Sequence, residues 1–199
     1  MSPGATRQRG VVALLLLFVT GCATTPPVAP AASVPVWDSR TAGLATLKGW
    51  QAHGRVAVTR GREGFSGGFD WREREGGSDI DVRGPIGIGG LSIRRDGEEV
   101  RITTSRGDVL VSQSVDRDLE ARLGVPLPVS YLRWWLIGQP APAPAPQPAP
   151  GTVGFEQAGW QVSYEQFGAA PWSLPGRMLA TRMDSRIRVV VDRWETGPP

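Results

Sequence analysis

The sequence predicts a mainly β, single-domain fold in which about ten antiparallel strands curl into a barrel or half barrel. From Trp50 onward, apolar and polar residues alternate with a period of two, which is typical of strands with one buried face. Glycine-containing turns divide this alternation into short runs. About ten such strands are too many for a flat sheet, so we expect the sheet to curve. About three short helices complete the prediction, and two of them interrupt the strands in mid-chain.

The chain begins with a segment typical of protein export. Arg7 and Arg9 precede an apolar run, residues 11–19, which is too short to span a bilayer. The only cysteine, Cys22, follows Gly21, so residues 1–21 resemble a bacterial lipoprotein signal peptide. That resemblance implies cleavage after Gly21, with diacylglycerol on the Cys22 sulfur and an acyl chain on its amino group. The alternative is an ordinary secretory signal with a chance cysteine.

The composition limits the classes of function. The chain has 22 basic and 19 acidic residues, a net charge of +3 and no basic stripe, which argues against nucleic acid as a partner. A single cysteine allows no internal disulfide, so the fold must depend on its core. Residues 22–36 are expected to be a lipidated N-terminus with a flexible Pro/Ala-rich tether. Residues 37–199 would then form the domain.

The expected strands share the alternating pattern and are bounded by turns. They fall at residues 50–59, 65–74, 78–83, 91–94, 100–102 and 109–111, and again at 153–158, 160–167, 177–183 and 186–194. Asp96-Gly97 and Asp184-Ser185 are predicted turns between neighbouring strands. In the last strand Ile187, Val189 and Val191 are expected to point inward.

The expected helices share a helical spacing of apolar residues and a glycine at or after their end. They fall at residues 37–49, 116–123 and 129–137. Asp116 is predicted to cap the second helix and Gly124 to end it. Residues 140–150, PAPAPAPQPAP, are predicted to form neither helix nor sheet, because proline lacks an N–H group. We expect them to be an exposed loop in the polyproline conformation.

No strong catalytic pattern is present, and we expect no enzyme activity. Residues 64–68 match the G-x-S-x-G pattern of serine hydrolases around Ser66, but that pattern needs a following helix and a later histidine. Here a strand follows, and the single histidine, His53, lies upstream. His53 has no second histidine or cysteine with which to bind a metal, so we expect a hydrogen-bonded strand residue there. Apart from the acyl groups on Cys22, no metal or cofactor is expected.

Two apolar features suggest contact with lipid. The segment 83–90 links two strands, yet it contains Ile86 and Ile88 where polar turn residues are usual. Exposed apolar side chains in a loop indicate an apolar partner, but a bulged strand with both isoleucines packed inside fits equally well. The chain is also rich in tryptophan, with eight residues. These side chains either pack a plain core or wall a cavity that suits an acyl chain.

Several motifs, taken in order, resemble the LolB family of outer-membrane lipoprotein receptors. The matching segments run from Trp37 to Trp194 and are Gly54-Arg55-Val56-Ala57, Phe69-Asp70-Trp71, Gly84-Pro85-Ile86-Gly87, Gly124-Val125-Pro126-Leu127-Pro128, Leu132-Arg133-Trp134-Trp135-Leu136-Ile137-Gly138, Gly159-Trp160-Gln161-Val162-Ser163-Tyr164 and Asp192-Arg193-Trp194. No single motif is decisive, but their order and spacing are specific. The resemblance implies an unclosed antiparallel half barrel of ten or eleven strands, with helices covering an apolar cavity for acyl chains.

The resemblance also implies site residues. Pro85, Ile86 and Gly87 would form a membrane-insertion loop, with Ile86 in place of the family's leucine. The acyl-chain cavity would be lined by one valine and five tryptophans: Val189, Trp37, Trp71, Trp135, Trp160 and Trp194. Ala23 in place of an aspartate after Cys22 implies sorting to the outer membrane.

The function implied is that of a monomeric receptor, lipid-anchored on the periplasmic side of the outer membrane. It would accept lipoprotein cargo from a LolA-like periplasmic carrier and insert that cargo among the outer-membrane lipids. A modest difference in affinity for the acyl chains would drive transfer without ATP. The alternative is a lipoprotein scaffold that has a dry, packed core and binds an envelope-assembly partner without lipid transfer.

Overall fold

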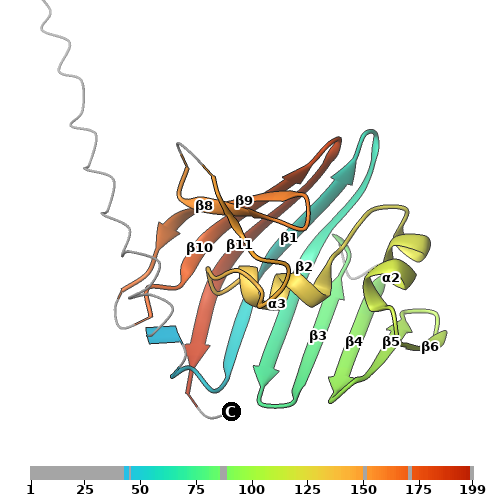
Figure 1. Ribbon diagram of the computed structural model, residues 1–199. Helices are drawn as coiled ribbons and strands as arrows, with labels where there is room; N and C mark the ends of the chain where they lie inside the picture. Colours follow the sequence, from blue (N-terminus) through green and yellow to red (C-terminus); the bar gives the residue numbers. More distant parts are fainter. Residues whose placement is uncertain (1–42, 45, 86–88, 150–151, 170–171, 198–199) are drawn as a thin grey trace, which may run out of the picture. The chain divides into compact units, whose positions relative to one another are not determined.

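The computed structural model describes residues 43–44, 46–85, 89–149, 152–169 and 172–197. All of them belong to one compact unit, Val34–Pro199. Within this described part, eleven strands form one antiparallel sheet in the order β6-β5-β4-β3-β2-β1-β11-β10-β9-β8-β7 (Figure 1). The strands are β1 (Trp50–Arg60), β2 (Glu63–Arg74), β3 (Gly77–Arg83), β4 (Gly90–Asp96), β5 (Glu99–Thr104), β6 (Val109–Ser112), β7 (Gln147–Pro148), β8 (Gly154–Gln157), β9 (Trp160–Phe167), β10 (Pro175–Arg182) and β11 (Ser185–Thr196).

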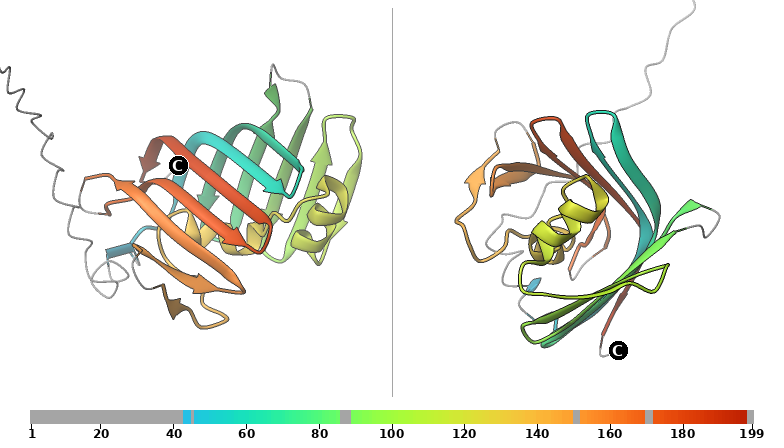
Figure 2. Two further views of the ribbon diagram at one scale, coloured as in Figure 1. Left: turned by 90° about the horizontal axis from the view of Figure 1, so that it is seen from above. Right: turned by 90° about the vertical axis from the view of Figure 1, so that its right-hand side faces the viewer.

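The sheet of this unit is curved and unclosed. β6 and β7 are its two edges and do not pair with each other. Figure 2 shows the strands curving around helices α2 (Val115–Leu123) and α3 (Val129–Trp135), which lie on the concave side. The predicted unclosed half barrel is therefore confirmed. In the described part of the chain, no helix is both long and apolar enough to cross a membrane.

The centre of the sheet is the pairing of β1 with β11, which joins the two ends of the domain. Both strands are long, and their register runs from Trp50 opposite Thr196 to Arg60 opposite Ser185. The register shifts between His53 and Gly54, where β11 carries an extra residue. The predicted inward positions Ile187 and Val189 are buried and contribute to the core.

Helix α2 begins earlier than its sequence pattern predicts. Ser114, not Asp116, occupies the N-cap position, and Gly124 ends the helix in the left-handed conformation with φ of 72°. Asp116 lies in the first turn, where its carboxylate accepts hydrogen bonds from the backbone N–H and the hydroxyl of Ser130. The predicted cap is wrong because this carboxylate instead links α2 to the start of α3.

The two other predicted helices are partly changed. α3 ends at Trp135, two residues before the predicted end, although the Leu136 N–H still bonds to the Leu132 carbonyl. Of the predicted helix at residues 37–49, only Gly43 and Leu44 are described as helical, and residues 37–42 lie outside the described residues. Leu44 is buried in the main core.

The Pro/Ala segment departs from its prediction at one place. Residues 142–148 are exposed as expected, but β7 at Gln147–Pro148 pairs with β8, opposite Glu156 and Phe155. The prediction that the segment forms no sheet is thus wrong here. A proline can join an edge strand because its carbonyl still accepts hydrogen bonds and its missing N–H points away from the ladder.

The bulge between β1 and β11 gives a test of the fold. A Cβ atom on Gly54 would lie 2.1 Å from the Val190 carbonyl oxygen, whereas one on Gly68 would meet nothing closer than 3.8 Å. We expect Gly54→Ala to lower the free energy of unfolding by about 1–3 kcal/mol, because the backbone of β11 must shift. Gly68→Ala is the matched control and should change it by less than about 0.5 kcal/mol. Urea denaturation measures both, and equal stabilities would contradict the close packing at Gly54.

Candidate functional site

An apolar cavity of about 40 Å³ lies between α3 and the concave face of the sheet. All the described residues that line it are apolar. They are Val56, Phe69, Trp71, Ile80, Val82, Ile93, Leu127, Val129, Leu132, Leu136 and Val189. Because they come from five strands and from the helical segment, only the folded sheet brings them together.

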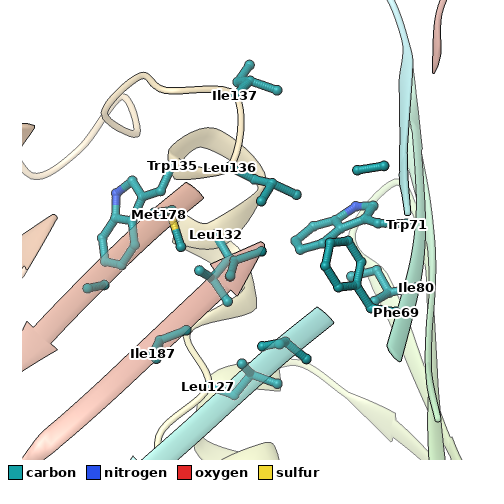
Figure 3. Packing of buried hydrophobic residues seen from close by; sticks show 14 of the residues in the cluster. Phe69, Trp71, Ile80, Leu127, Leu132, Trp135, Leu136, Ile137, Met178 and Ile187 are labelled. Atoms are coloured by element: carbon teal, nitrogen blue, oxygen red, sulfur yellow. The ribbon is translucent and has the colours of Figure 1, made fainter. Parts of the chain in front are cut away.

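Figure 3 shows the two walls of this cavity. Phe69 and Trp71 of β2 lie beside Ile80 of β3, and across from them are Leu132 and Leu136 of the α3 segment. Phe69 and Trp71 are two residues apart, so both point to the concave side of a strand. Leu132 and Leu136 are four apart and share one face of the helix. The local periods of strand and helix therefore create a wholly apolar lining.

The tryptophans predicted for the cavity lie in different places. Trp71 is in its lining, together with Val189. Trp135 points away from Trp71 (Figure 3), and its indole N–H donates to Oε1 of Gln157 in β8 at 2.8 Å. Trp160 packs 6.3 Å from the Trp135 ring, centroid to centroid. Both are fully buried in the core and are not among the lining residues of the cavity.

A second aromatic group sits next to the cavity. The Trp50 ring lies 5.5 Å from the centroid of Trp71 and 5.5 Å from that of Trp194. Trp194 itself is partly buried, and its indole N–H donates to the Pro175 carbonyl at 2.9 Å. Trp50 was predicted only as the first residue of a strand. Its inward position in the period-two pattern of β1 was the available signal.

The remaining predicted site residues lie at the limit of the described chain or beyond it. Cys22, Trp37, Ile86 and Gly87 are outside the described residues. Pro85 is described and exposed. The Gly84 N–H donates to the Gly89 carbonyl at 3.1 Å, so the segment between β3 and β4 leaves and re-enters the sheet at adjacent points.

The concave side also holds a buried carboxylate that sequence reasoning missed. The side chain of Glu73 is 8% exposed, and its Oε1 accepts from Arg95 Nη2 at 2.8 Å and from Arg133 Nη2 at 2.9 Å. Its Oε2 accepts from the indole N–H of Trp71 at 3.1 Å. Burial lowers the pKa of Arg133, while the charge of Glu73 opposes that shift. The signal was present, since Glu73 continues the inward series of Phe69 and Trp71 on β2.

Helix α3 is therefore attached to the sheet on two sides by different means. On the β2 and β4 side, Arg133 of the helix forms the ion pair with Glu73. On the β8 and β9 side, Trp135 bonds to Gln157, and the Tyr164 hydroxyl donates to the Trp135 carbonyl at 2.9 Å. The first attachment is ionic and adjoins the cavity lining. The second is neutral, buried and aromatic.

The residues considered for hydrolysis do not form a catalytic group. His53 Nδ1 contacts Asp70, and its Nε2 lies 3.5 Å from Glu195 Oε1. In the β1–β2 ladder His53 is opposite Asp70, whereas Ser66 is opposite Ala57, four positions away. The hydrogen bond from His53 lowers the pKa of Asp70, opposed by partial burial. In the described residues, no three histidine, cysteine, aspartate or glutamate side chains are grouped to hold a metal.

Comparisons with known proteins identify the family of this chain. Residues 48–194 match the family model described as outer membrane lipoprotein LolB. A protein named outer-membrane lipoprotein LolB from Thiobacillus denitrificans is 32% identical over 197 residues, which cover 96% of this chain and all of the relative. A protein of the same name from Pseudomonas putida is 34% identical over 80% of this chain and 80% of the relative. Another, from Nitrosococcus oceani, is 28% identical over 94% of this chain and 96% of the relative. The chain therefore belongs to the LolB family of outer-membrane lipoproteins.

Proposed function

We propose that this protein accepts lipoproteins from a periplasmic carrier by enclosing their acyl chains beneath α3, and then inserts them into the outer membrane. The observation that carries this proposal is the cavity under α3, because every described residue that lines it is apolar. Each methylene removed from water contributes about 0.8 kcal/mol, so such a lining favours a hydrocarbon chain over any polar ligand. The role needs no catalytic group.

Transfer is driven by differences in affinity. A receptor that binds the acyl chains better than the carrier does will receive them, and a bilayer that binds them better still will take them away. Cys22 would hold the receptor at its target membrane through its acyl chains, because more than one chain is needed for stable anchoring. Residues 22–36 would serve as the tether and residues 37–199 as the binding domain.

Loading requires α3 to move. The cavity of about 40 Å³ is far smaller than the roughly 300–1,000 Å³ of a typical ligand site. Leu132 and Leu136 form the movable wall, and the ion pair between Arg133 and Glu73 must break as that wall leaves the sheet. The bonds of Trp135 and Tyr164 on the β8–β9 side would act as the hinge. We therefore infer that the Glu73–Arg133 pair is a latch that holds the empty receptor closed.

The small cavity also favours a second candidate function. A core that is nearly filled is what a scaffold needs if it only binds an envelope-assembly partner and transfers no lipid. The deciding experiment uses the soluble protein with Cys22 replaced, mixed with a purified carrier that holds a labelled lipoprotein. Movement of the label to this protein supports the receptor. If the label stays on the carrier while the protein is folded, the scaffold is favoured.

Filling the cavity should weaken loading. Val189 lies in the lining, so Val189→Trp places a large ring where the acyl chain would bind. We expect at least a roughly tenfold loss of affinity for a fluorescent fatty acid, because the added ring excludes several methylenes. Val111→Trp, at an exposed position on the edge strand β6, is the matched control. Normal loading of Val189→Trp would show that this valine does not line the acyl site.

Delivery should depend on the apolar residue in the segment between β3 and β4. We expect Ile86→Glu to accept cargo normally but to release it poorly into liposomes, since a charged side chain is costly to insert into the bilayer. Ile86→Leu is the control and should deliver normally. The measurement is the fraction of labelled lipoprotein that floats with the liposomes. Delivery by Ile86→Glu at the normal rate would argue against insertion.

Releasing the latch should speed loading. Arg133→Gln removes the ion pair, while Glu73 keeps its bonds to Arg95 and Trp71 and so is not left unpaired. A hydrogen bond to a charged group contributes about 1 kcal/mol when partly exposed, so uptake of the fluorescent fatty acid should become roughly fivefold faster. Stopped-flow fluorescence measures the rate. Arg101→Gln, which breaks an exposed pair with Glu99, is the control. Equal uptake rates for Arg133→Gln and Arg101→Gln would show that the Glu73–Arg133 pair does not hold the receptor closed.

A further inference from the structure

A second hollow is lined by residues at the ends of β1 and β3. Figure 1 shows the arrows of these two strands pointing to the same end of the sheet. The volume of this hollow is about 1190 Å³, and it is open to solvent. The β1–β2 turn, the residues flanking the β3–β4 loop, the β5–β6 turn and the last residues of α2 surround it. We call it the end hollow. It is distinct from the cavity beneath α3 and much larger.

The charges around the end hollow are unbalanced. Three arginines line it, Arg62, Arg106 and Arg122, with Glu63 as the acidic residue among the lining. Among the described residues, the side chains of Arg62 and Arg122 have no ion-pair or hydrogen-bond partner, and the contact of Arg106 with Asp108 is long, at 4.0 Å. Nearby Arg60, by contrast, is fully engaged with Glu120 and the Gly124 carbonyl. The hollow thus offers cations that remain available for an anion.

The rest of the lining is suited to a lipid. Phe65, Leu91 and Leu123 line the same hollow as the arginines, so apolar surface lies beside the cations. This combination matches an amphiphile with an anionic head and a hydrocarbon body. A small soluble anion would make no contact with the apolar side chains that line the hollow.

The end hollow also adjoins both parts of the proposed transfer site. Val82 lines it and also lines the cavity beneath α3. Pro85 and Gly89, on either side of the proposed insertion segment, line it as well. The hollow therefore adjoins the point at which the proposed insertion segment leaves and re-enters the sheet.

We propose that the end hollow binds the headgroup phosphate of an anionic phospholipid of the target membrane. Guanidinium groups bind phosphate through paired hydrogen bonds, and Phe65, Leu91 and Leu123 would contact the first methylenes of its acyl chains. The bound lipid would hold the opening of the receptor against the bilayer, next to the point where the cargo leaves. This inference deepens the proposed function and rests on it.

The test uses the full chain with Cys22→Ser, so that no variant is lipidated. Flotation compares its binding to vesicles of phosphatidylcholine with and without phosphatidylglycerol. The apolar residues 11–19 contribute equally in every variant, so differences report on the hollow. The preference for anionic vesicles is the ratio of binding with phosphatidylglycerol to binding without it. We expect Arg122→Gln and Arg62→Gln each to lower this ratio roughly fivefold. Arg117→Gln is the matched control, because Arg117 is on the same helix as Arg122, carries the same charge and does not line the hollow.

Three outcomes would overturn the proposal. An equal loss with Arg117→Gln would mean that only overall charge attracts the protein to the vesicles. Displacement from the vesicles by millimolar inorganic phosphate, at constant ionic strength, would assign the hollow to a free anion. Unchanged vesicle binding of Arg122→Gln with weakened capture of the carrier would assign it to an acidic protein surface. Cargo transfer without vesicles tests the proposed function separately, so the two failures are distinguishable.

Discussion

The structure depends on covering the apolar concave face of a curved sheet whose edges do not meet. The β1–β11 pairing at the centre of the order joins the two arms of the sheet, and strands of both arms contribute inward residues to one core. A closed barrel would fill this surface with its own side chains. Here α3 must cover it, and a helix of seven residues is enough only because its Leu132, Trp135 and the following Leu136 are all buried.

A cover of this kind can be held firmly on one side and weakly on the other. The Trp135 and Trp160 rings with Gln157 and Tyr164 make a buried, neutral attachment to β8 and β9. The Glu73–Arg133 pair on the opposite side is ionic and is partly exposed at the arginine. For the proposed receptor, this asymmetry would let α3 open while the aromatic packing stays intact. The apolar lining would then be exposed only while acyl chains are being received.

The convex side of the sheet differs in character. Arg83 and His53 both contact Asp70, and Arg94 bonds to Asp81 at 3.0 Å, so charged side chains of opposite sign alternate along neighbouring strands. Such a surface stays in water. The described part of the chain therefore combines a polar convex face, an apolar cavity beneath α3 and an end hollow lined by both arginines and apolar side chains.

The sequence by itself determined the strands, because their period of two follows directly from burying one face of a pleated chain. It also determined the family, because several motifs occur in the order and at the spacing typical of LolB proteins. Tertiary structure alone decided which apolar residues share the cavity: Trp71 and Val189 meet there, while Trp135 turns away toward β8 and β9. Periodicity says that a side chain is buried but not against which partner, since that depends on the curvature of the sheet and the placement of α3. For the same reason, the pairing of Glu73 with Arg133, which lie far apart in the chain, is visible only in the folded arrangement of β2 and α3.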